Sequence, residues 1–598
     1  MSKVSANFIA VIDFGSQYTH LITRCLGELG VKTKLLTPLA SIKQLSGAAG
    51  LILSGGPMSV IKNPVPYNPQ LLKLRLPTLG ICYGLQLIAQ INGGTVRPGR
   101  IREYGPAKLK LTGANKLLAG WPKNSQVWMS HGDSVTKLPV GFINLGSTAS
   151  LPQAAAAHKR LPIWGVQFHP EVQHTTFGQR LYKNFAFDIC GLKSQNQTDK
   201  LKQLATQIRA QVGNKKVFLL VSGGVDSTVV FALLNKTLGP NRVYGLHVDT
   251  GFMRRQESQL VKKQLAKAGF GNLHIISAGK IFFHNLKGVT EPETKRQIIG
   301  RTFLQVKIQA EKILKLNTKN WLLGQGTIYP DTIESGGTKH ADKIKTHHNR
   351  IGLLARLAAK GLLVEPLKNL YKDEVRLLGS QLGLALELLW AHPFPGPGLA
   401  VRALCLDQPT AQKLNRLSAA SIKINKYPAR ILPLFSVGVQ GDERSYRQPL
   451  AIEAPYSKAV SLHNQAAGLV NKNKIINRVL LKLAGPNLNI GRVRPATLTP
   501  QRIKILQQAD DIVTQELKHS HSYQKLWQCP TILAPFGKLK GESIILRPFA
   551  SREAMTGTAY ILDPGVIKKI TQRLMALRGV DYIFYDLTDK PPGTVEWE

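Results

Sequence analysis

The chain has 598 residues, with 79 Lys plus Arg against 35 Asp plus Glu and a formal net charge of +44. Its length predicts about four domains of ordinary size, or two or three larger ones. Its five cysteines are an odd number without CxxC spacing, which argues against a disulfide framework and a zinc site. No apolar run approaches the ~18 residues of a membrane span, and Phe8–Ile12 runs directly into Asp13, unlike a secretory signal. These features favour a cytoplasmic enzyme.

The basic residues are spread along the whole chain in small groups, such as Lys215-Lys216 and Lys262-Lys263. A strongly positive field attracts anionic ligands and nucleic acid alike. Because no long block of basic residues occurs, a solvated surface is favoured over a dedicated nucleic-acid site.

The first domain, residues 1–191, alternates short apolar runs with Gly-rich turns, which predicts an α/β fold. We expect parallel strands at Phe8–Ile12, 50–53 and 77–81. The third runs into GICYGLQLIAQINGG, which places Cys82 on a sharp strand-to-helix turn. Such a turn exposes a thiol at a helix N-terminus, where the helix dipole lowers its pKa. A lone cysteine before a helix is more often a small buried apolar residue.

A second candidate catalytic segment, GVQFHPE, covers residues 165–171. His169 and Glu171 are two apart, so in an extended segment both side chains point to the same side, where a base and its orienting carboxylate could face Cys82. Alone, this segment is typical of an ordinary loop. Its occurrence together with SGGP at 54–57 and MSHGD at 129–133 favours a catalytic site.

In this chain order, these residues resemble the Cys-His-Glu triad of the class I glutamine amidotransferases. The resemblance implies a flavodoxin-like domain whose oxyanion hole is formed with Gly55 and Gly56. It also implies that Cys82 attacks the glutamine side-chain amide, that His169 moves the proton, and that a thioester hydrolyses after ammonia leaves.

A polar segment, 193–216, predicts a linker that leads into a second domain at residues 192–401. There the apolar run 217–221 is followed by SGGVDS and then by the helical run 228–234. A strand that turns through Gly223 and Gly224 into a helix is suited to hold phosphate, because backbone N–H groups converge on the ligand. A turn without a ligand is the alternative. The candidate phosphate-binding residues are Ser222, Gly223, Gly224, Val225, Asp226, Ser227 and Thr228.

The spacing differs from a Walker A motif and resembles the signature loop of the ATP pyrophosphatases, which split ATP between its α and β phosphates. The resemblance implies a parallel-sheet domain like the adenine nucleotide α-hydrolases. It implies Mg²⁺ as the cofactor that accompanies ATP, with Asp226 as a ligand, and no tightly bound organic cofactor. Asp249, after the expected strand 243–248, suits either a ribose or adenine contact or a helix cap in a strand-to-helix loop.

Further segments resemble the glutamine-hydrolysing GMP synthase family: GVTEPETKRQIIGR at 288–301, LLGQGTIYPDTIES at 322–335, KTHHN at 345–349, VEPLKNLYKDEV at 364–375, HPFPGPGL at 392–399 and DLTDKPPGTVEWE at 586–598. The proline-rich HPFPGPG must be an irregular loop. The resemblance implies a ligase that aminates xanthosine 5′-monophosphate (XMP) to GMP. ATP would adenylylate XMP, and ammonia from glutamine would then displace AMP by a route sheltered from water.

The same resemblance implies XMP contacts at five positions. Lys590 would pair with the phosphate and Glu596 would read the base edge or the ribose. Arg296, Asp442 and Gln528 complete the set. A mobile tail is the alternative, but Pro591-Pro592 and Trp597 favour a docked one.

The third domain, 402–598, is expected to be α+β. Its segments 432–454 and 531–555 have similar layouts, which predicts two tandem α/β subdomains like those of the longer form of the family. A monomer would then suffice, with a homodimer as the alternative. Met58, Ala391 and Ala400 depart from the family's usual residues, and Ala391 removes a possible phosphate contact.

Two alternatives come from other classes of protein. One is an NAD synthetase or a tRNA-thiolating enzyme that uses the same ATP loop. The other is a regulatory protein that kept the fold and lost the chemistry. The intact Cys82, His169, Glu171 and SGGVDS argue against the second, and the lack of added cysteines or an RNA-binding module argues against thiolation.

Overall fold

The computed structural model describes residues 7–16, 18–113, 115–172, 174–194, 200–313, 319–328, 331, 356–417, 421–440, 443–473, 475–538, 541–551 and 557–598. The chain forms two compact units, Met1–Lys200 and Leu201–Glu598. In the described part of the chain, no helix is long and apolar enough to cross a membrane.

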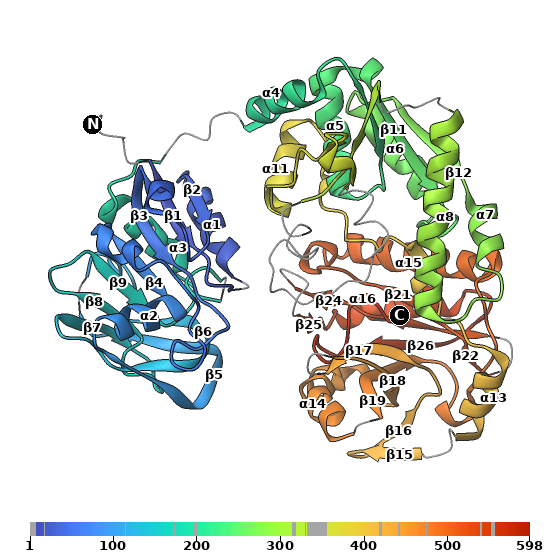
Figure 1. The fold of residues 1–598 in the computed structure, drawn as a ribbon. Coiled ribbons are helices and arrows are strands. Elements are labelled where there is room, and N and C mark those ends of the chain that lie inside the picture. The colour runs from blue at the N-terminus through green and yellow to red at the C-terminus, as the bar shows by residue number, and fades with distance from the viewer. Residues whose placement is uncertain are drawn as a thin grey trace. The chain divides into compact units, whose positions relative to one another are not determined.

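The first unit is built on a nine-stranded sheet with the order β2-β1-β3-β4-β9-β8-β7-β5-β6 (Figure 1). The strands from β2 to β9 are parallel, and those from β8 onward are antiparallel. Their bounds are β1 Phe8–Ile12, β2 Thr33–Leu36, β3 Ala48–Leu53, β4 Thr78–Ile81, β5 Thr95–Leu111, β6 Asn124–Lys137, β7 Phe142–Ser147, β8 Ala155–His158 and β9 Ile163–Val166. The expected first three parallel strands are confirmed, as β1, β3 and β4.

Both faces of this sheet are covered. Alternate residues of β3 belong to different apolar clusters, Ile52 to one and Leu51 to the other, because successive side chains of a strand point to opposite faces. The helices of this unit are α1 Thr19–Glu28, α2 Tyr83–Ile91 and α3 Gly178–Lys183. A Cβ on Gly84 would lie 2.3 Å from the carbonyl oxygen of Leu53, so a glycine lets α2 approach β3 closely.

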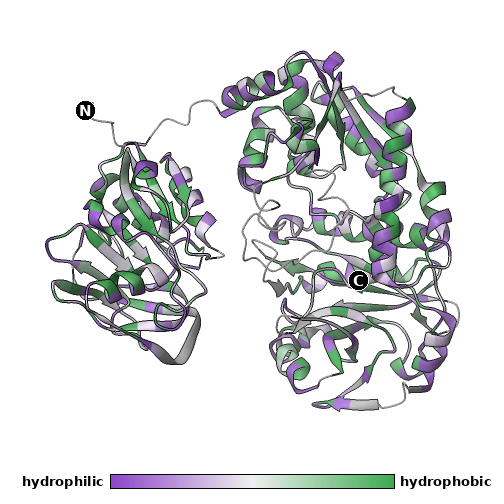
Figure 2. Ribbon diagram, viewed as in Figure 1, coloured by the Kyte–Doolittle hydropathy of each residue, from purple (hydrophilic) through white to green (hydrophobic). Residues whose placement is uncertain are grey.

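The second unit begins with a five-stranded parallel sheet in the order β12-β11-β10-β13-β14. Its strands are β10 Lys216–Leu220, β11 Val243–Asp249, β12 Leu273–Ser277, β13 Trp321–Gly324 and β14 Leu363–Val364. Its helices are α4 Lys200–Val212, α5 Val225–Leu238, α6 Glu257–Lys267, α7 Gly279–Asn285, α8 Pro292–Ile313, α11 Lys372–Gln381 and α12 Leu386–Leu389. Figure 2 shows hydrophilic and hydrophobic residues side by side on α4, whose Leu204 and Ile208 are buried.

The chain continues on one side of β10 through β11 and on its other side through β13. The end of β10 is therefore a topological switch point, where open α/β sheets bind ligands. The SGGVDS loop lies directly after this end.

An eight-stranded sheet completes the unit, with the path β15-β16-β18-β19-β26-β23-β21 and with β17 paired to β18. Its strands are β15 Ser421–Ile424, β16 Tyr427–Ile431, β17 Ser436–Gln440, β18 Glu443–Ile452, β19 Ile476–Ala484, β21 Thr531–Ala534, β23 Glu542–Leu546 and β26 Val580–Asp586. The helices are α13 Gln408–Leu417, α14 Ala459–Lys472, α15 Pro500–His519 and α16 Pro564–Met575. Short strands are β20 Arg492–Val493, β22 Phe536–Gly537, β24 Phe549–Ala550 and β25 Thr558–Ala559.

The C-terminal sheet consists of two halves with the same layout. In the first, the hairpin β17-β18 is followed by α14 and by β19, which is parallel to β18. In the second, β21 and β23 form the antiparallel pair, and α16 leads to β26, parallel to β23. The two halves join through the antiparallel pair β19 and β26.

One apolar cluster extends through both sheets of the second unit. It contains Phe218 and Phe252 from the first sheet and its loops, and Leu533 and Tyr585 from the second. Helix α8 contributes Val306 to this cluster, and Figure 1 shows it extending from the five-stranded sheet toward the C-terminal sheet. The domain limit expected at residue 401 therefore falls inside one compact unit.

Candidate active sites

Cys82 lies on the turn between β4 and α2 with φ 50° and ψ −103°, a strained conformation for a residue with a side chain. The turn is held because the backbone N–H of Cys82 donates to the carbonyl of Val166 at 2.8 Å. The thiol is buried rather than exposed, at 4% relative exposure. Its sulfur lies 3.7 Å from the carbonyl oxygen of Ser130 and 3.5 Å from Nε2 of Gln167. The predicted elbow is present, but its thiol is covered by the chain.

His169 and Glu171 form a buried pair, with 2.6 Å between Nδ1 and Oε1. Burial by itself would lower the pKa of His169, but the Glu171 carboxylate and the Cys82 sulfur, which also shares a hydrogen bond with the ring, raise this pKa well above its ordinary value. Because Nδ1 is hydrogen-bonded to Glu171, the other ring nitrogen is the one that can exchange a proton with Cys82. The structure thus brings the three predicted residues together.

The SGGP segment lies against this site. A Cβ on Gly55 would lie 3.0 Å from Cε1 of His169, and one on Gly56 would lie 2.7 Å from the carbonyl oxygen of Phe14. The hydroxyl of Ser54 accepts a hydrogen bond from the backbone N–H of Phe14 at 2.9 Å. Glycine is therefore needed here to bring backbone close to the histidine. Met58, which departs from the family's residue, is 49% exposed.

The SGGVDS loop turns from β10 into α5 with Gly223 at φ 85°. The hydroxyls of Ser222 and Ser227 lie 3.0 Å apart, and Ser227 accepts from the backbone N–H of Ser222 at 3.1 Å. Gly224 is the N-cap residue and has no side chain to cover the first turn of α5. The helix N-terminus can therefore present N–H groups and a positive dipole end to an anion.

Asp226 lies in the first turn of α5, where its Oδ2 is 2.6 Å from Nζ of Lys372. Its other oxygen, Oδ1, is buried and has no hydrogen-bond partner among the described residues. No cluster of three or more His, Cys, Asp or Glu that could hold a metal ion occurs in the described ranges. Mg²⁺ commonly takes one or two carboxylates and completes its shell with phosphate oxygens and water, so Asp226 fits as its protein ligand beside ATP.

Two neighbouring segments shape this end of the sheet. A Cβ on Gly326, in the LLGQGT segment, would lie 3.0 Å from the backbone nitrogen of Ser227. At the end of β11, Oδ1 of Asp249 accepts from the backbone N–H of Gly251 at 2.9 Å. Gly251 lies in the loop before α6, whose N-cap is Gln256, so this contact holds the loop and is not the expected helix cap. The KTHHN segment lies outside the described residues.

The HPFPGPG segment is irregular, as predicted from its prolines. Gly398 has φ 67°, and a Cβ there would lie 2.4 Å from the carbonyl oxygen of Phe252. The guanidinium groups of Arg254 and Arg402 lie 4.7 and 5.3 Å from the centre of the Phe394 ring. The loop thus connects the first sheet of the second unit to Arg402, at the start of its C-terminal part. Ala400, one of the residues that departs from the family's usual pattern, lies near this loop and is fully buried.

Two of the five predicted XMP residues, Gln528 and Glu596, lie in direct contact. The amide of Gln528 donates to Oε1 of Glu596 at 2.9 Å. The fully buried Arg402 donates to both carboxylate oxygens, at 3.0 Å from Nε to Oε2 and 2.8 Å from Nη2 to Oε1. Arg402 also pairs with Asp510 at 3.7 Å. The side chain of Glu596 keeps 22% exposure, so one side of this carboxylate remains accessible.

The remaining predicted XMP residues are placed differently. Arg296 lies in the first turns of α8 and pairs with Glu293 at 3.4 Å. Lys590 pairs through its backbone with Gly557, and its side chain is half-buried. Asp442 lies outside the described residues.

The tail is docked, as predicted. Trp597 is fully buried, and its Nε1 donates to Oδ2 of Asp586 at 3.1 Å. Arg478 lies 4.9 Å from the centre of its ring and donates to the carbonyls of Thr594 and Glu596 at 3.0 and 3.2 Å.

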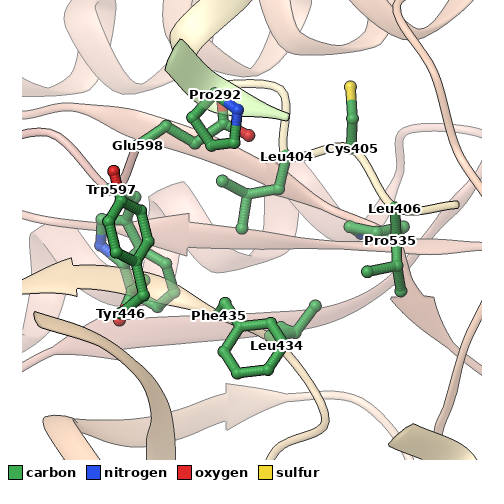
Figure 3. A pocket seen from close by; sticks show the side chains of 11 residues that line it. Pro292, Leu404, Cys405, Leu406, Leu434, Phe435, Tyr446, Pro535, Trp597 and Glu598 are labelled. Atoms are coloured by element: carbon green, nitrogen blue, oxygen red, sulfur yellow. The ribbon is translucent and has the colours of Figure 1, made fainter. Parts of the chain in front are cut away.

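A cavity of about 250 Å³ lies beside this tail (Figure 3). Its walls are mostly apolar and aromatic, and they also include Glu598 and Cys405. Its lining residues are Pro292, Leu404, Cys405, Leu406, Leu434, Phe435, Ser436, Tyr446, Pro535, Trp597 and Glu598.

Sequence reasoning missed three charged residues of these sites: Lys372, Arg402 and Lys295. Lys372 lies in the VEPLKNLYKDEV segment and Arg402 closely follows HPFPGPGL, so a family motif in or beside each residue could have indicated it. Lys295 directly precedes Arg296 and is fully buried. Burial of a lysine is unusual, and the sequence does not reveal it.

Comparison with known proteins gives three matching family models. They are the class-I glutamine amidotransferase model over residues 10–189, the NAD synthase model over 197–298 and the GMP synthase C terminal domain model over 515–597. The chain is 41% identical to a probable glutamine-hydrolysing GMP synthase of Leptospira interrogans, over 99% of both chains. It is 36% identical to the GMP synthase of Dictyostelium discoideum, over 99% of this chain and 94% of that one. It is 37% identical to the GMP synthase of Thermosipho africanus, over 99% of this chain and 100% of that one.

The amidotransferase domain of the first unit, together with the NAD synthase-like domain of the second, defines a glutamine-dependent ligase that uses ATP. The full-length relatives then specify the acceptor class, whereas the NAD synthase model matches only residues 197–298. The chain belongs to the glutamine-hydrolysing GMP synthase family.

Proposed function

We propose that Cys82, His169 and Glu171 release ammonia from glutamine, and that the SGGVDS loop presents ATP to XMP. The net reaction converts XMP, ATP, glutamine and water to GMP, AMP, pyrophosphate and glutamate. The observation that carries the proposal is the buried pair of His169 and Glu171 at 2.6 Å, next to Cys82. Such a pair orients and charges an imidazole for proton exchange with a thiol.

In the first unit, the Cys82 sulfur attacks the amide carbon of glutamine, and His169 gives its proton to the departing ammonia. Water then hydrolyses the thioester to glutamate, with His169 as the base. Backbone N–H groups near Gly55 and Gly56 stabilise the negative oxygen of each tetrahedral intermediate, because the absence of side chains lets them approach it. Glu171 keeps the imidazole in the productive orientation.

In the second unit, residues 222–228 hold the ATP phosphates at the switch point of the sheet. The oxygen at C2 of XMP attacks the α-phosphorus and pyrophosphate leaves. Ammonia then adds at C2 and AMP leaves, which gives GMP. Asp226 would hold Mg²⁺, which when bound would supply positive charge against the phosphate oxygens. Lys372, at 2.6 Å from Asp226, holds the carboxylate in position.

XMP binds at the C-terminal sheet in this proposal. Lys590 pairs with its phosphate, and the accessible side of Glu596 accepts from the base or the ribose. Gln528 and Arg402 fix the Glu596 carboxylate. Arg296 and Asp442 complete the contacts.

The test is to incubate the protein with ATP, Mg²⁺, glutamine and XMP and to measure GMP, AMP and pyrophosphate. Absence of GMP would disprove the proposed reaction. Cys82→Ala should lose the glutamine-dependent rate and keep the rate with added ammonium, whereas Asp226→Ala should lose both. A glutamine-dependent rate that survives in Cys82→Ala would show that the triad is wrongly assigned.

We further propose that one chain suffices. The joined halves of the C-terminal sheet support this, because the repeat supplies within one chain a pairing that two chains could otherwise share. Light scattering on the purified protein would test it, and a dimer at assay concentration would contradict it. The five free thiols support a reducing, cytoplasmic compartment.

A further inference from the structure

Lys295 and Glu598 form an ion pair inside the second unit that no step above uses. Lys295 is 0% exposed, and the Glu598 side chain is 5% exposed. Ionic side chains are rarely buried so completely, because removing two charges from water is strongly unfavourable. Such a pair is weak evidence for stability, so its role must be sought in what it holds.

The pair connects three segments that are distant in sequence. Lys295 lies in the first turns of α8, and its ammonium donates to the carbonyls of Ala400 and Ala403 at 3.3 and 3.2 Å. The Glu598 carboxylate lies at the end of the docked tail and accepts from the backbone N–H of Cys405 as well. The ammonium and the carboxylate are thus each held by the 400–405 segment and by one another.

Each of these three segments carries a residue of the proposed XMP site. Arg296 is the neighbour of Lys295 on α8. Arg402 lies between the two carbonyls that accept from Lys295, and it holds Glu596 through two hydrogen bonds. Glu596 itself lies two residues before Glu598.

The same three segments also line the cavity in Figure 3, through Pro292, Cys405 and Glu598. A shift of any one of them would move a proposed nucleotide contact relative to the other two.

We propose that Lys295 and Glu598 are positioning residues for XMP: their ion pair sets the relative positions of Arg296, Arg402 and Glu596. This inference rests on the proposed function, since it assumes that XMP binds to these residues. Neither side chain needs to touch the substrate. A directional pair of charges holds one arrangement of the segments, whereas apolar packing would tolerate several.

The test compares Lys295→Met, Glu598→Gln and the double variant in ammonium-dependent GMP synthesis, which bypasses Cys82. Glu453→Gln is the matched control, because Glu453 also binds one lysine, Lys482 at 2.7 Å, and one backbone N–H, that of Leu488 at 2.9 Å. Each single variant should raise the KM for XMP about tenfold while the KM for ATP stays within about twofold. The control should leave both KM values unchanged.

The double variant separates positioning from stability. Removing both charges leaves no unpaired buried ion, so its unfolding temperature should recover toward that of the wild type. Its KM for XMP should stay raised, because the directional pair is still missing. If that KM recovers together with stability, if the KM values for XMP and ATP rise equally, or if neither single variant folds, the pair is a stabilising element only and the inference is wrong. Failure of the proposed function is distinguishable, since the wild type would then form no GMP.

Discussion

The guanidinium of Arg402 binds both carboxylate oxygens of Glu596, 194 residues away in sequence, at 3.0 and 2.8 Å. Burial by itself would lower the pKa of Arg402, but the charge and hydrogen bonds of Glu596, together with Asp510, raise this pKa above its ordinary value. The planar fork of an arginine suits this contact, and a lysine cannot reproduce it. The Glu596 carboxylate is therefore held in one orientation by the chain itself.

Arg402→Lys tests this relationship. The variant keeps the buried charge but loses one of the paired hydrogen bonds, so we expect the KM for XMP to rise and the free energy of unfolding to fall by about 1–3 kcal/mol. Steady-state kinetics with ammonium and chemical denaturation measure the two effects. Arg573→Lys is the control, because Arg573 pairs with Glu516 at a side-chain exposure of 40% and should change stability by no more than about 0.5 kcal/mol. An unchanged KM for XMP in Arg402→Lys would contradict the proposed role of Glu596.

Glu171→Gln should separate the two half-reactions. The variant removes the carboxylate that raises the pKa of His169 and orients its ring, so glutamine hydrolysis should fall about a hundredfold or more. The ammonium-dependent rate should remain, since the chemistry of the second unit does not use Glu171. Glutamate release and GMP formation, measured side by side, check the prediction. Equal loss of both rates would argue against it.

The raised pKa of His169 also predicts a pH dependence of stability. The contribution of protonated His169 to the free energy of unfolding is fully present below the unfolded-state pKa of about 6.5. It is lost as the pH rises through the higher folded-state pKa. Thermal unfolding of the first unit should therefore occur at lower temperature as the solution becomes alkaline. The Glu171→Gln variant should show a weaker dependence, and an identical pH profile would rule out this linkage.

His392 predicts the opposite dependence in the second unit. Burial lowers its pKa to about 4 and outweighs the raising effect of the hydrogen bond to the Tyr523 carbonyl, and the nearby Arg254, Lys518 and Arg402 lower it further. The neutral ring stacks on Tyr523 with centroids 3.6 Å apart. The contribution of neutral His392 to the free energy of unfolding is fully present above its unfolded-state pKa of about 6.5. It is lost as the pH falls toward the folded-state pKa, and the total loss is on the order of 3 kcal/mol. Denaturation of wild type and His392→Gln at several acidic pH values would measure this, and parallel profiles would refute it.

Gly84→Ala should damage the cysteine turn. The added methyl would lie 2.3 Å from the carbonyl oxygen of Leu53, so α2 must move away from β3 and carry Cys82 with it. We expect a loss of about 1–3 kcal/mol in stability and a larger loss of glutamine hydrolysis. Gly27→Ala is the control, because nothing lies within 4 Å of its added Cβ in helix α1, and it should stabilise by about 0.5–1 kcal/mol. Wild-type glutamine hydrolysis in Gly84→Ala would contradict the close packing.

The sequence alone was sufficient to predict the local elements and the chemistry that they carry. Alternation of buried strands with Gly-rich turns predicted β1, β3, β4, β10 and β11, and paired glycines before a helix predicted the phosphate-binding loop. These features depend on neighbours in the chain. The family resemblance added the assignment of the triad, and the prolines and Trp597 of the tail predicted that it docks. The structure placed Cys82, His169 and Glu171 together as expected.

Only the tertiary structure revealed the partners that hold these residues. Nothing near Glu596 in sequence indicates Arg402, and nothing near Asp226 indicates Lys372. The sequence suggested an exposed thiol at Cys82, yet the fold covers it. Pairing of charges and burial depend on which segments pack together, and a one-dimensional pattern does not contain those distances. Sequence therefore determined which chemical groups the protein brings to its reaction, and packing decided which of them meet, because a buried charge is tolerated only where the fold supplies its partner.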